Sequence, residues 1–100
     1  MHDPIHDRPE ESRFVLELGA SIAFVRYRRE GDDGGVLVLT HAEVPAELEG
    51  RGVGSRLVAA VLALVRERGE RVVPVCPFIA RCMQRHAETA DLLAARPPRD

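Results

Sequence analysis

The stretch Glu49-Gly50-Arg51-Gly52-Val53-Gly54-Ser55 separates a short apolar segment from a long one. Three glycines at alternate positions let the backbone approach a ligand closely, because no Cβ stands in the way. The helix expected to follow directs its free N–H groups and the positive end of its dipole at this loop. The stretch therefore predicts an anion site, suited to a phosphate or a pyrophosphate.

The apolar pattern around this loop predicts strands and helices in a definite order. Strands are expected at residues 13–18, 21–28, 36–44 and 71–76. A long helix should begin at residue 53 or 55 and end at 68, with Gly69 as its C-cap. A second helix should begin at Pro77, and residues 87–95 suggest a further helical stretch. Three meandering strands followed by a β-α-β crossover predict an α/β (α+β) fold, a mixed, mostly antiparallel sheet with two or three helices packed on it.

Length and composition limit what the chain can be. One hundred residues predict a single domain, expected over residues 12–95, with a flexible tail at 1–11 and a frayed tail at 96–100. The net charge of −2 implies no general attraction to nucleic acid. The sequence has no run of about 18 apolar residues, so no membrane span is predicted. Two cysteines make no disulfide framework, so we expect a cytoplasmic protein with reduced thiols.

Common phosphate-binding loops match this stretch poorly. A P-loop requires a lysine that is missing at the corresponding position, and Leu57 stands where a dinucleotide fingerprint has its third glycine. The same glycines would also suit a tight turn that only leads into a helix. The loop by itself leaves both interpretations open.

With its flanking residues, the chain resembles the GNAT superfamily of N-acetyltransferases, whose acetyl-CoA signature is Gln/Arg-x-x-Gly-x-Gly/Ala. It is most similar to a branch of small, single-domain members. Three sequence blocks over roughly residues 12–95 carry the resemblance: Thr40-His41-x-x-Val44-Pro45, Gly52-x-Gly54-Ser55, and Val72-x-Pro74-x-Cys76-Pro77-Phe78. One departure is Glu49 at the first signature position, where a carboxylate would disfavour an anion. We expect Glu49 to point away from the pyrophosphate.

The resemblance implies acetyl-CoA as the cofactor and places its arm where two strands diverge. Pro74 is compatible with such a gap, because it removes a backbone donor there. The expected cofactor-binding residues belong to a strand end, the glycine loop and the first helical turn. They are Ala42, Val44, Gly50, Arg51, Gly52, Val53, Gly54, Ser55 and Arg56.

Acetyl transfer to an amine requires a base, since a lysine-type amine has a pKa of about 10.4 and is protonated in solution. His41 and Glu43 are two residues apart on the predicted strand 36–44, so both should point to one face. Thr40, Ala42 and Val44 should point to the other. A histidine beside a carboxylate makes a candidate base. The alternative is that His41 only forms a structural hydrogen bond and Glu43 is a solvated surface charge.

Cys76 is the third catalytic candidate, at a strand end just before the expected helix start at Pro77. A helix dipole can lower a thiol pKa there, so Cys76 could accept the acetyl group with His41 as its base. It could instead line the thioester pocket or protonate the departing sulfur. A buried apolar role is the remaining alternative.

The sequence leaves the acceptor amine and the partners open. Cys76, Cys82 and His86 lack a standard zinc spacing, so no metal site is expected. A monomer or a weak homodimer is compatible with the size and a free strand edge. We expect an acetyl-CoA-binding N-acetyltransferase. A non-catalytic acyl-CoA-binding or regulatory module on the same fold, and a small interaction domain whose glycine loop is only structural, are the alternatives.

Overall fold

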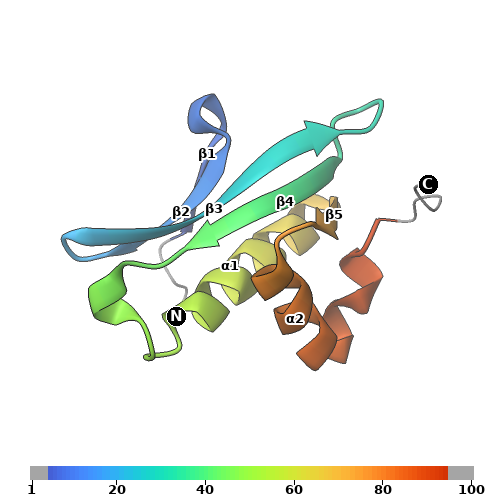
Figure 1. Ribbon diagram of the computed structural model, residues 1–100. Coiled ribbons are helices and arrows are strands. Elements are labelled where there is room, and N and C mark those ends of the chain that lie inside the picture. Colours follow the sequence, from blue (N-terminus) through green and yellow to red (C-terminus); the bar gives the residue numbers. More distant parts are fainter. Residues whose placement is uncertain (1–4, 95–100) are drawn as a thin grey trace.

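Five strands form one sheet in the order β1-β2-β3-β4-β5 in a computed structural model that describes residues 5–94 (Figure 1). The first four pair antiparallel, and the fifth pairs parallel to the fourth. A parallel neighbour requires a crossover connection, which the long helix supplies. The strands are β1 (Ile5–Arg8), β2 (Arg13–Leu18), β3 (Ser21–Glu30), β4 (Val36–Glu43) and β5 (Arg71–Pro74).

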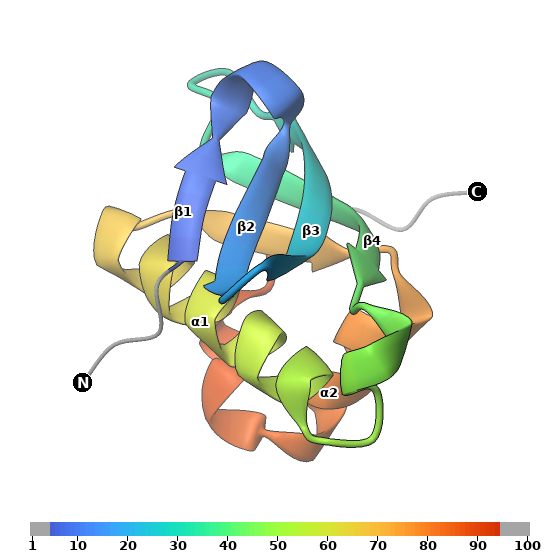
Figure 2. The same cartoon turned by 90° about the vertical axis from the view of Figure 1, so that its left-hand side faces the viewer.

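The two α-helices lie together on one side of this sheet (Figures 1 and 2). The opposite side, which we call the outer face, carries no α-helix in the described part of the chain. The predicted mixed, mostly antiparallel α+β fold is confirmed. The α-helices are α1 (Val53–Arg68) and α2 (Pro77–Arg85), and the 3-10 helices are η1 (Pro9–Glu11), η2 (Ala46–Leu48) and η3 (Ala87–Leu92).

The core lies between the sheet and α1. Leu57, Val61 and Val65 of this helix are buried against the sheet. Burying such a side chain completely contributes about 1.5–3 kcal/mol. As predicted, Gly69 ends the helix in the left-handed conformation, with φ of 70°. The other sides of α1 are only partly covered, because Ala59 and Ala63 remain exposed.

The prediction of a flexible tail at residues 1–11 is wrong for residues 5–11, which form β1 and η1. Ile5 pairs with Leu16, and Asp7 pairs with Phe14. The strand was missed because it has a single apolar residue, and because Asp7 is bound by Arg68, 61 residues further along the chain. Residues 1–4 and the predicted tail at 96–100 lie outside the described residues.

Four further boundaries differ from the predicted ones. The strand predicted at 21–28 extends to Glu30, and the strand predicted at 36–44 ends at Glu43. The strand expected to continue to Cys76 ends at Pro74, because proline has no N–H to continue the ladder. The helical stretch expected over 87–95 is the 3-10 helix η3, which ends at Leu92. Beyond it, Ala94 N donates to the oxygen of Val72, which covers part of the β5 edge.

A polar network ties β1 to the end of α1. The Tyr27 hydroxyl donates to Asp7 Oδ1 at 2.6 Å, and Arg68 Nη1 donates to Asp7 Oδ2 at 2.8 Å. Arg29 lies 3.7 Å from the same carboxylate and donates to Glu70 at 2.9 Å. Burial, and then the bond to Asp7, raise the pKa of Tyr27 from 10.0 to about 12.

This shift predicts a loss of stability at high pH. Between about pH 10 and 12 the unfolded chain loses the Tyr27 proton while the folded chain keeps it, so the free energy of unfolding falls as pH rises. The chain has one tyrosine and no lysine, so no other side chain has its ordinary pKa in this window. Urea unfolding at several pH values should show this fall in the native chain and not in Tyr27→Phe. If the free energy of unfolding falls equally with pH in both proteins, groups other than Tyr27 cause the pH dependence.

Candidate functional site

A bulge in β4 determines which side chains reach each face of the sheet. Arg26 pairs with His41 and Tyr27 pairs with Leu39, so Thr40 is an extra residue in the register, and its hydroxyl donates to the Arg26 oxygen at 3.2 Å. The extra residue reverses the alternation of the strand. Leu39 and Ala42 therefore both face the core. The side chain of His41 lies on the outer face.

Along its last residues, β4 has no β5 neighbour on the edge opposite to β3. β4 pairs with β5 only from Val36 to Leu39, although it continues to Glu43. The N–H groups of Val75 and Cys76 both donate to the Leu39 oxygen at 3.0 Å, and there the two strands diverge. The gap expected from Pro74 is present, and the end of β4 is an open edge.

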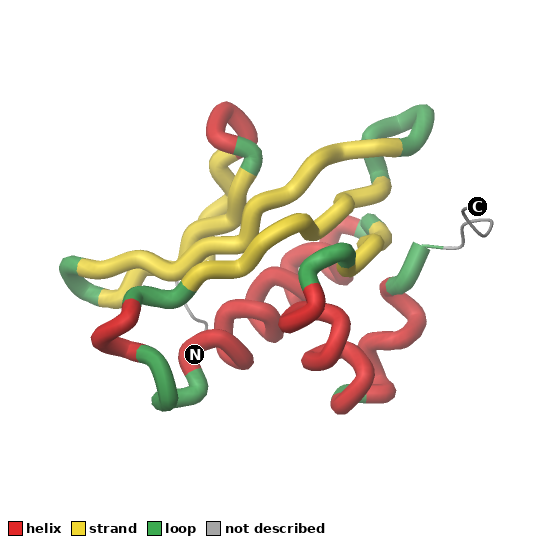
Figure 3. The backbone as a smooth tube through the Cα atoms, viewed as in Figure 1, coloured by secondary structure: helices red, strands yellow, loops and turns green. Residues whose placement is uncertain are grey.

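The glycine loop leads into α1 and leaves the start of this helix uncapped (Figure 3). Gly52 is the N-cap, with φ of 76°, a backbone conformation that residues with a side chain rarely adopt. Among residues 5–94 no side chain caps the helix, and its first turn has no acidic residue. The first helical bond runs from Arg56 N to Gly52 O at 3.1 Å. The preceding N–H groups, of Val53, Gly54 and Ser55, have no partner within the helix.

A cavity of about 350 Å³ lies where the end of β4 meets this helix start. It brings together seven of the nine predicted cofactor-binding residues. The other two, Arg51 and Arg56, are exposed and are not among its lining residues. The lining residues are Ala42, Val44, Leu48, Glu49, Gly50, Gly52, Val53, Gly54, Ser55 and Phe78.

Three lining residues were not among the predicted cofactor-binding residues. Leu48 comes from the 3-10 turn η2, which the sequence does not indicate. Glu49 lines the cavity too, and the orientation of its carboxylate relative to a pyrophosphate stays a prediction. Phe78 packs on the helix start so closely that a Cβ on Gly54 would lie 2.8 Å from its ring. The third glycine thus makes room for an aromatic side chain, and the Cys-Pro-Phe block was the available signal.

The acid–base candidates lie on the outer face, on the opposite side of β4 from the cavity. His41 Nε2 and Glu43 Oε1 are 3.1 Å apart, and both side chains are more than half exposed. Ala42 and Val44, which alternate with them, line the cavity. The predicted same-face pair is therefore present, at the open end of the strand.

The structure does not join Cys76 to this pair. Cys76 is buried as the N-cap of α2, and its carbonyl oxygen accepts from Ala80 N. In the described part of the chain it forms no hydrogen bond with His41 and is not among the residues lining the cavity. Its role stays a prediction.

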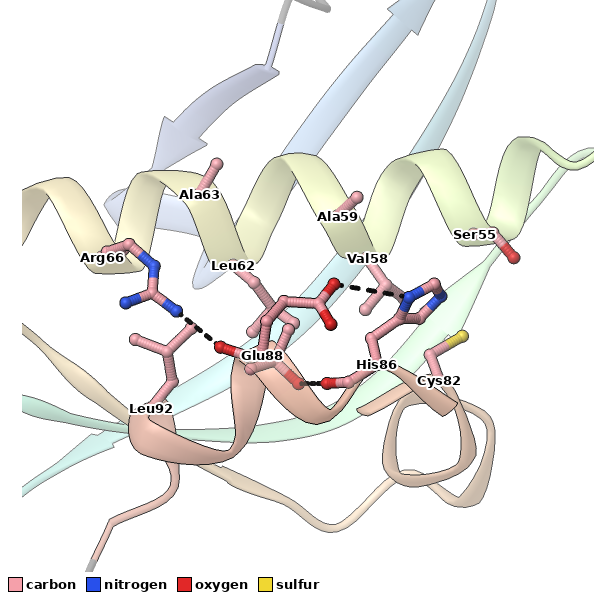
Figure 4. Close-up of a pocket in the computed structure, with 11 residues that line it drawn as sticks. Ser55, Val58, Ala59, Leu62, Ala63, Arg66, Cys82, His86, Glu88 and Leu92 are labelled. Atoms are coloured by element: carbon pink, nitrogen blue, oxygen red, sulfur yellow. Dashed lines mark hydrogen bonds and ion pairs between the residues drawn. The ribbon is translucent and has the colours of Figure 1, made fainter. Parts of the chain in front are cut away.

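A second groove, of about 320 Å³, runs along α1 beside α2 and η3 (Figure 4). It shares Ser55 with the first cavity and has an apolar floor that includes Val58, Leu62 and Leu92. Arg66 closes its far end by donating to both oxygens of Asp91, at 2.7 and 2.9 Å. These bonds hold the pKa of the Asp91 carboxyl below its ordinary value.

Within residues 5–94, no cluster of three histidine, cysteine, aspartate or glutamate side chains could hold a metal ion. Over the same range, no helix has the length and apolar character needed to cross a membrane.

Comparisons with known proteins agree with this geometry. Residues 13–92 match a family model described as GCN5-related N-acetyl-transferase. The chain is similar to the NMR structure of a GCN5-like protein from Staphylococcus aureus, with a TM-score of 0.65 and 24% identity. The similarity covers 93% of this chain and 89% of the other, and at this identity it shows the fold. No curated protein sequence matches the chain significantly.

Proposed function

Because the chain belongs to the GCN5-related N-acetyltransferase family, we propose that it binds acetyl-CoA at the start of α1 and transfers the acetyl group to an amine. The observation that carries the proposal is the uncapped start of α1, which lines a cavity at the open end of β4. An unpartnered helix N-terminus favours a phosphate group, and an open strand edge favours an extended amide-containing chain.

The pyrophosphate is assigned to the N–H groups of Val53, Gly54 and Ser55. They carry the positive end of the α1 dipole, and no acidic side chain in the first turn competes for them. Gly50 and Gly52 keep the loop in positive-φ conformations, so its backbone stays free of side chains at this point. The exposed Arg51 and Arg56 flank the loop and are proposed to add positive potential.

The pantetheine arm is assigned to the edge of β4 at Ala42 and Val44. Its amides resemble peptide groups, so they can pair with a strand that has lost its β5 neighbour. The adenosine end is assigned to the groove along α1, because this groove begins at Ser55, beside the helix start. Its apolar floor suits a purine ring.

Bound acetyl-CoA supplies an activated thioester. The chain supplies the base: with Glu43 accepting the Nε2 proton of His41, the Nδ1 atom keeps a free lone pair and can take a proton from the amine. Cys76, buried after the point where β4 and β5 diverge, is proposed either to protonate the departing sulfur or to carry the acetyl group as a thioester.

The test begins with binding. Acetyl-CoA and CoA at about 100 times Kd should stabilise the fold by about 2.7 kcal/mol. For a domain of this size, this raises the melting temperature by about 10 °C or more. Absence of any shift at near-millimolar ligand would leave the glycine loop a structural turn.

Catalysis is then tested by thiol release from acetyl-CoA with a panel of primary amines. His41→Gln should retain the thermal shift and lose transfer. Because the chain has no lysine, an acetyl group on the protein that hydroxylamine removes, and that Cys76→Ala lacks, would identify a thioester. Binding without transfer to any amine would instead indicate a non-catalytic acyl-CoA-binding module.

A further inference from the structure

The outer face of the sheet carries an aromatic ring surrounded by cationic side chains. The half-buried ring of Phe24 has the guanidinium carbon of Arg13 at 4.8 Å and that of Arg26 at 5.5 Å from its centroid. The His41 ring centroid is 6.2 Å away. The cross-strand pairs Arg13↔Arg26 and Arg26↔His41 place these residues in one row.

The cations of this face differ in their partners. Arg13 donates to Glu11 at 2.7 Å, and Arg28 donates to Glu30 at 2.9 Å. Arg26 stacks on Phe24 but has no ion pair within residues 5–94. Its positive charge is therefore available to an anion, beside His41 in the register of the sheet.

Arg26 is also close to the proposed chemistry. Its strand neighbour His41 is hydrogen-bonded to Glu43, whose carboxylate can attract an ammonium group. The cavity assigned to the cofactor lies behind these residues, and only β4 separates the two. Since β4 has no β5 neighbour beyond Leu39, a thioester at this edge can be approached from the outer face.

We propose that the acceptor is a zwitterionic amine, an amino acid or a similar compound whose carboxylate lies close to its amine. Arg26 binds the carboxylate, and Glu43 and His41 receive the ammonium group. The inference rests on the proposed function and names its substrate class. An unpaired cation beside the base also disfavours polyamines, which carry no carboxylate.

The reaction balances with these groups. The ammonium first releases one proton through His41 to water. The neutral nitrogen then forms a bond to the thioester carbonyl carbon while the C–S bond breaks. The sulfur leaves with the electron pair and takes up the second nitrogen proton, so one acetamide, one CoA thiol and one free proton result.

The experiment compares L-phenylalanine with phenethylamine, which differ only in the carboxylate. The ratio of their kcat/KM values removes effects common to both acceptors. A hydrogen bond to a charged group contributes about 1.5–3 kcal/mol, so Arg26→Gln should lower this ratio by at least about tenfold. Arg28→Gln, on the same strand and face but paired with Glu30, is the matched control and should leave the ratio unchanged.

The outcomes separate this inference from the proposed function. An unchanged ratio in Arg26→Gln would overturn the inference while transfer itself persists. Acetyl-CoA binding without transfer to either probe would also overturn it and leave the cofactor site standing. Absence of acetyl-CoA binding would remove the proposed function, and the inference with it. Thermal unfolding of each variant confirms that the fold is intact.

Discussion

Ser55→Asp is expected to weaken strongly the stabilisation of the fold by acetyl-CoA while making the unliganded protein slightly more stable. Ser55 is exposed at the third position of α1, where an N–H group faces the proposed pyrophosphate. A carboxylate there repels the phosphates. Two unit charges 4 Å apart interact with about 1 kcal/mol in water and about 4 kcal/mol near a protein surface. We expect the affinity to fall by about tenfold or more.

The same change has the opposite effect on the helix. An acidic residue in the first turn stabilises a helix by about 0.3–1 kcal/mol, and α1 has none. The melting temperature without ligand should therefore rise slightly, which separates lost binding from lost folding. Ser55→Asn has nearly the shape of the aspartate without its charge and should keep the ligand-induced shift. An undiminished shift in Ser55→Asp would place the pyrophosphate elsewhere.

Substitution of Glu49 removes a negative charge at the same cavity, where Ser55→Asp adds one. Glu49 lines the site proposed for an anion and is exposed, so solvent weakens the effect of its charge. Exposed charge pairs contribute about 0.2–1 kcal/mol. Glu49→Gln should accordingly tighten acetyl-CoA binding by up to about fivefold, and added salt should reduce the difference between the two proteins.

Asp7→Ala is expected to cause the second large effect, a loss of about 2–4 kcal/mol in the free energy of unfolding. The Asp7 side chain is only 9% exposed and accepts hydrogen bonds from Tyr27 and Arg68. Removing it leaves a buried hydroxyl and two guanidinium groups without their carboxylate. Total stabilities are about 5–15 kcal/mol, so urea unfolding would detect the change easily.

Glu10→Ala is the matched control for Asp7→Ala. Glu10 lies three residues further along the chain in η1, and its side chain is exposed. Its removal should change the free energy of unfolding by no more than about 0.5 kcal/mol. Equal effects of the two substitutions would mean that β1 does not depend on the network around Asp7.

Much of the architecture could be predicted from the chain because it is local. Short apolar runs on either side of the Gly19-Ala20 turn indicated β2 and β3, and Gly69 marked the end of α1. The glycine loop and its flanking blocks indicated both the fold and seven residues of the cavity. These features depend on spacing along the sequence, which backbone geometry converts directly into position.

The remaining features depend on contacts between distant residues. β1 exists because Ile5 pairs with Leu16 and Asp7 meets Arg68, which no pattern within residues 5–8 reveals. Likewise, the extra residue Thr40 directs His41 to the outer face, where Arg26 lies in register.

The sequence by itself determined the order of β2, β3, β4, α1, β5 and α2 and the start of α1 at a glycine loop, because short-range backbone preferences decide both. Three sequence blocks carried the resemblance to the family. Only the tertiary structure decided what faces the cavity and what faces the outer side of the sheet. One extra residue in a strand reverses the direction of every side chain after it, and the pairing of distant strands decides where that residue is accommodated.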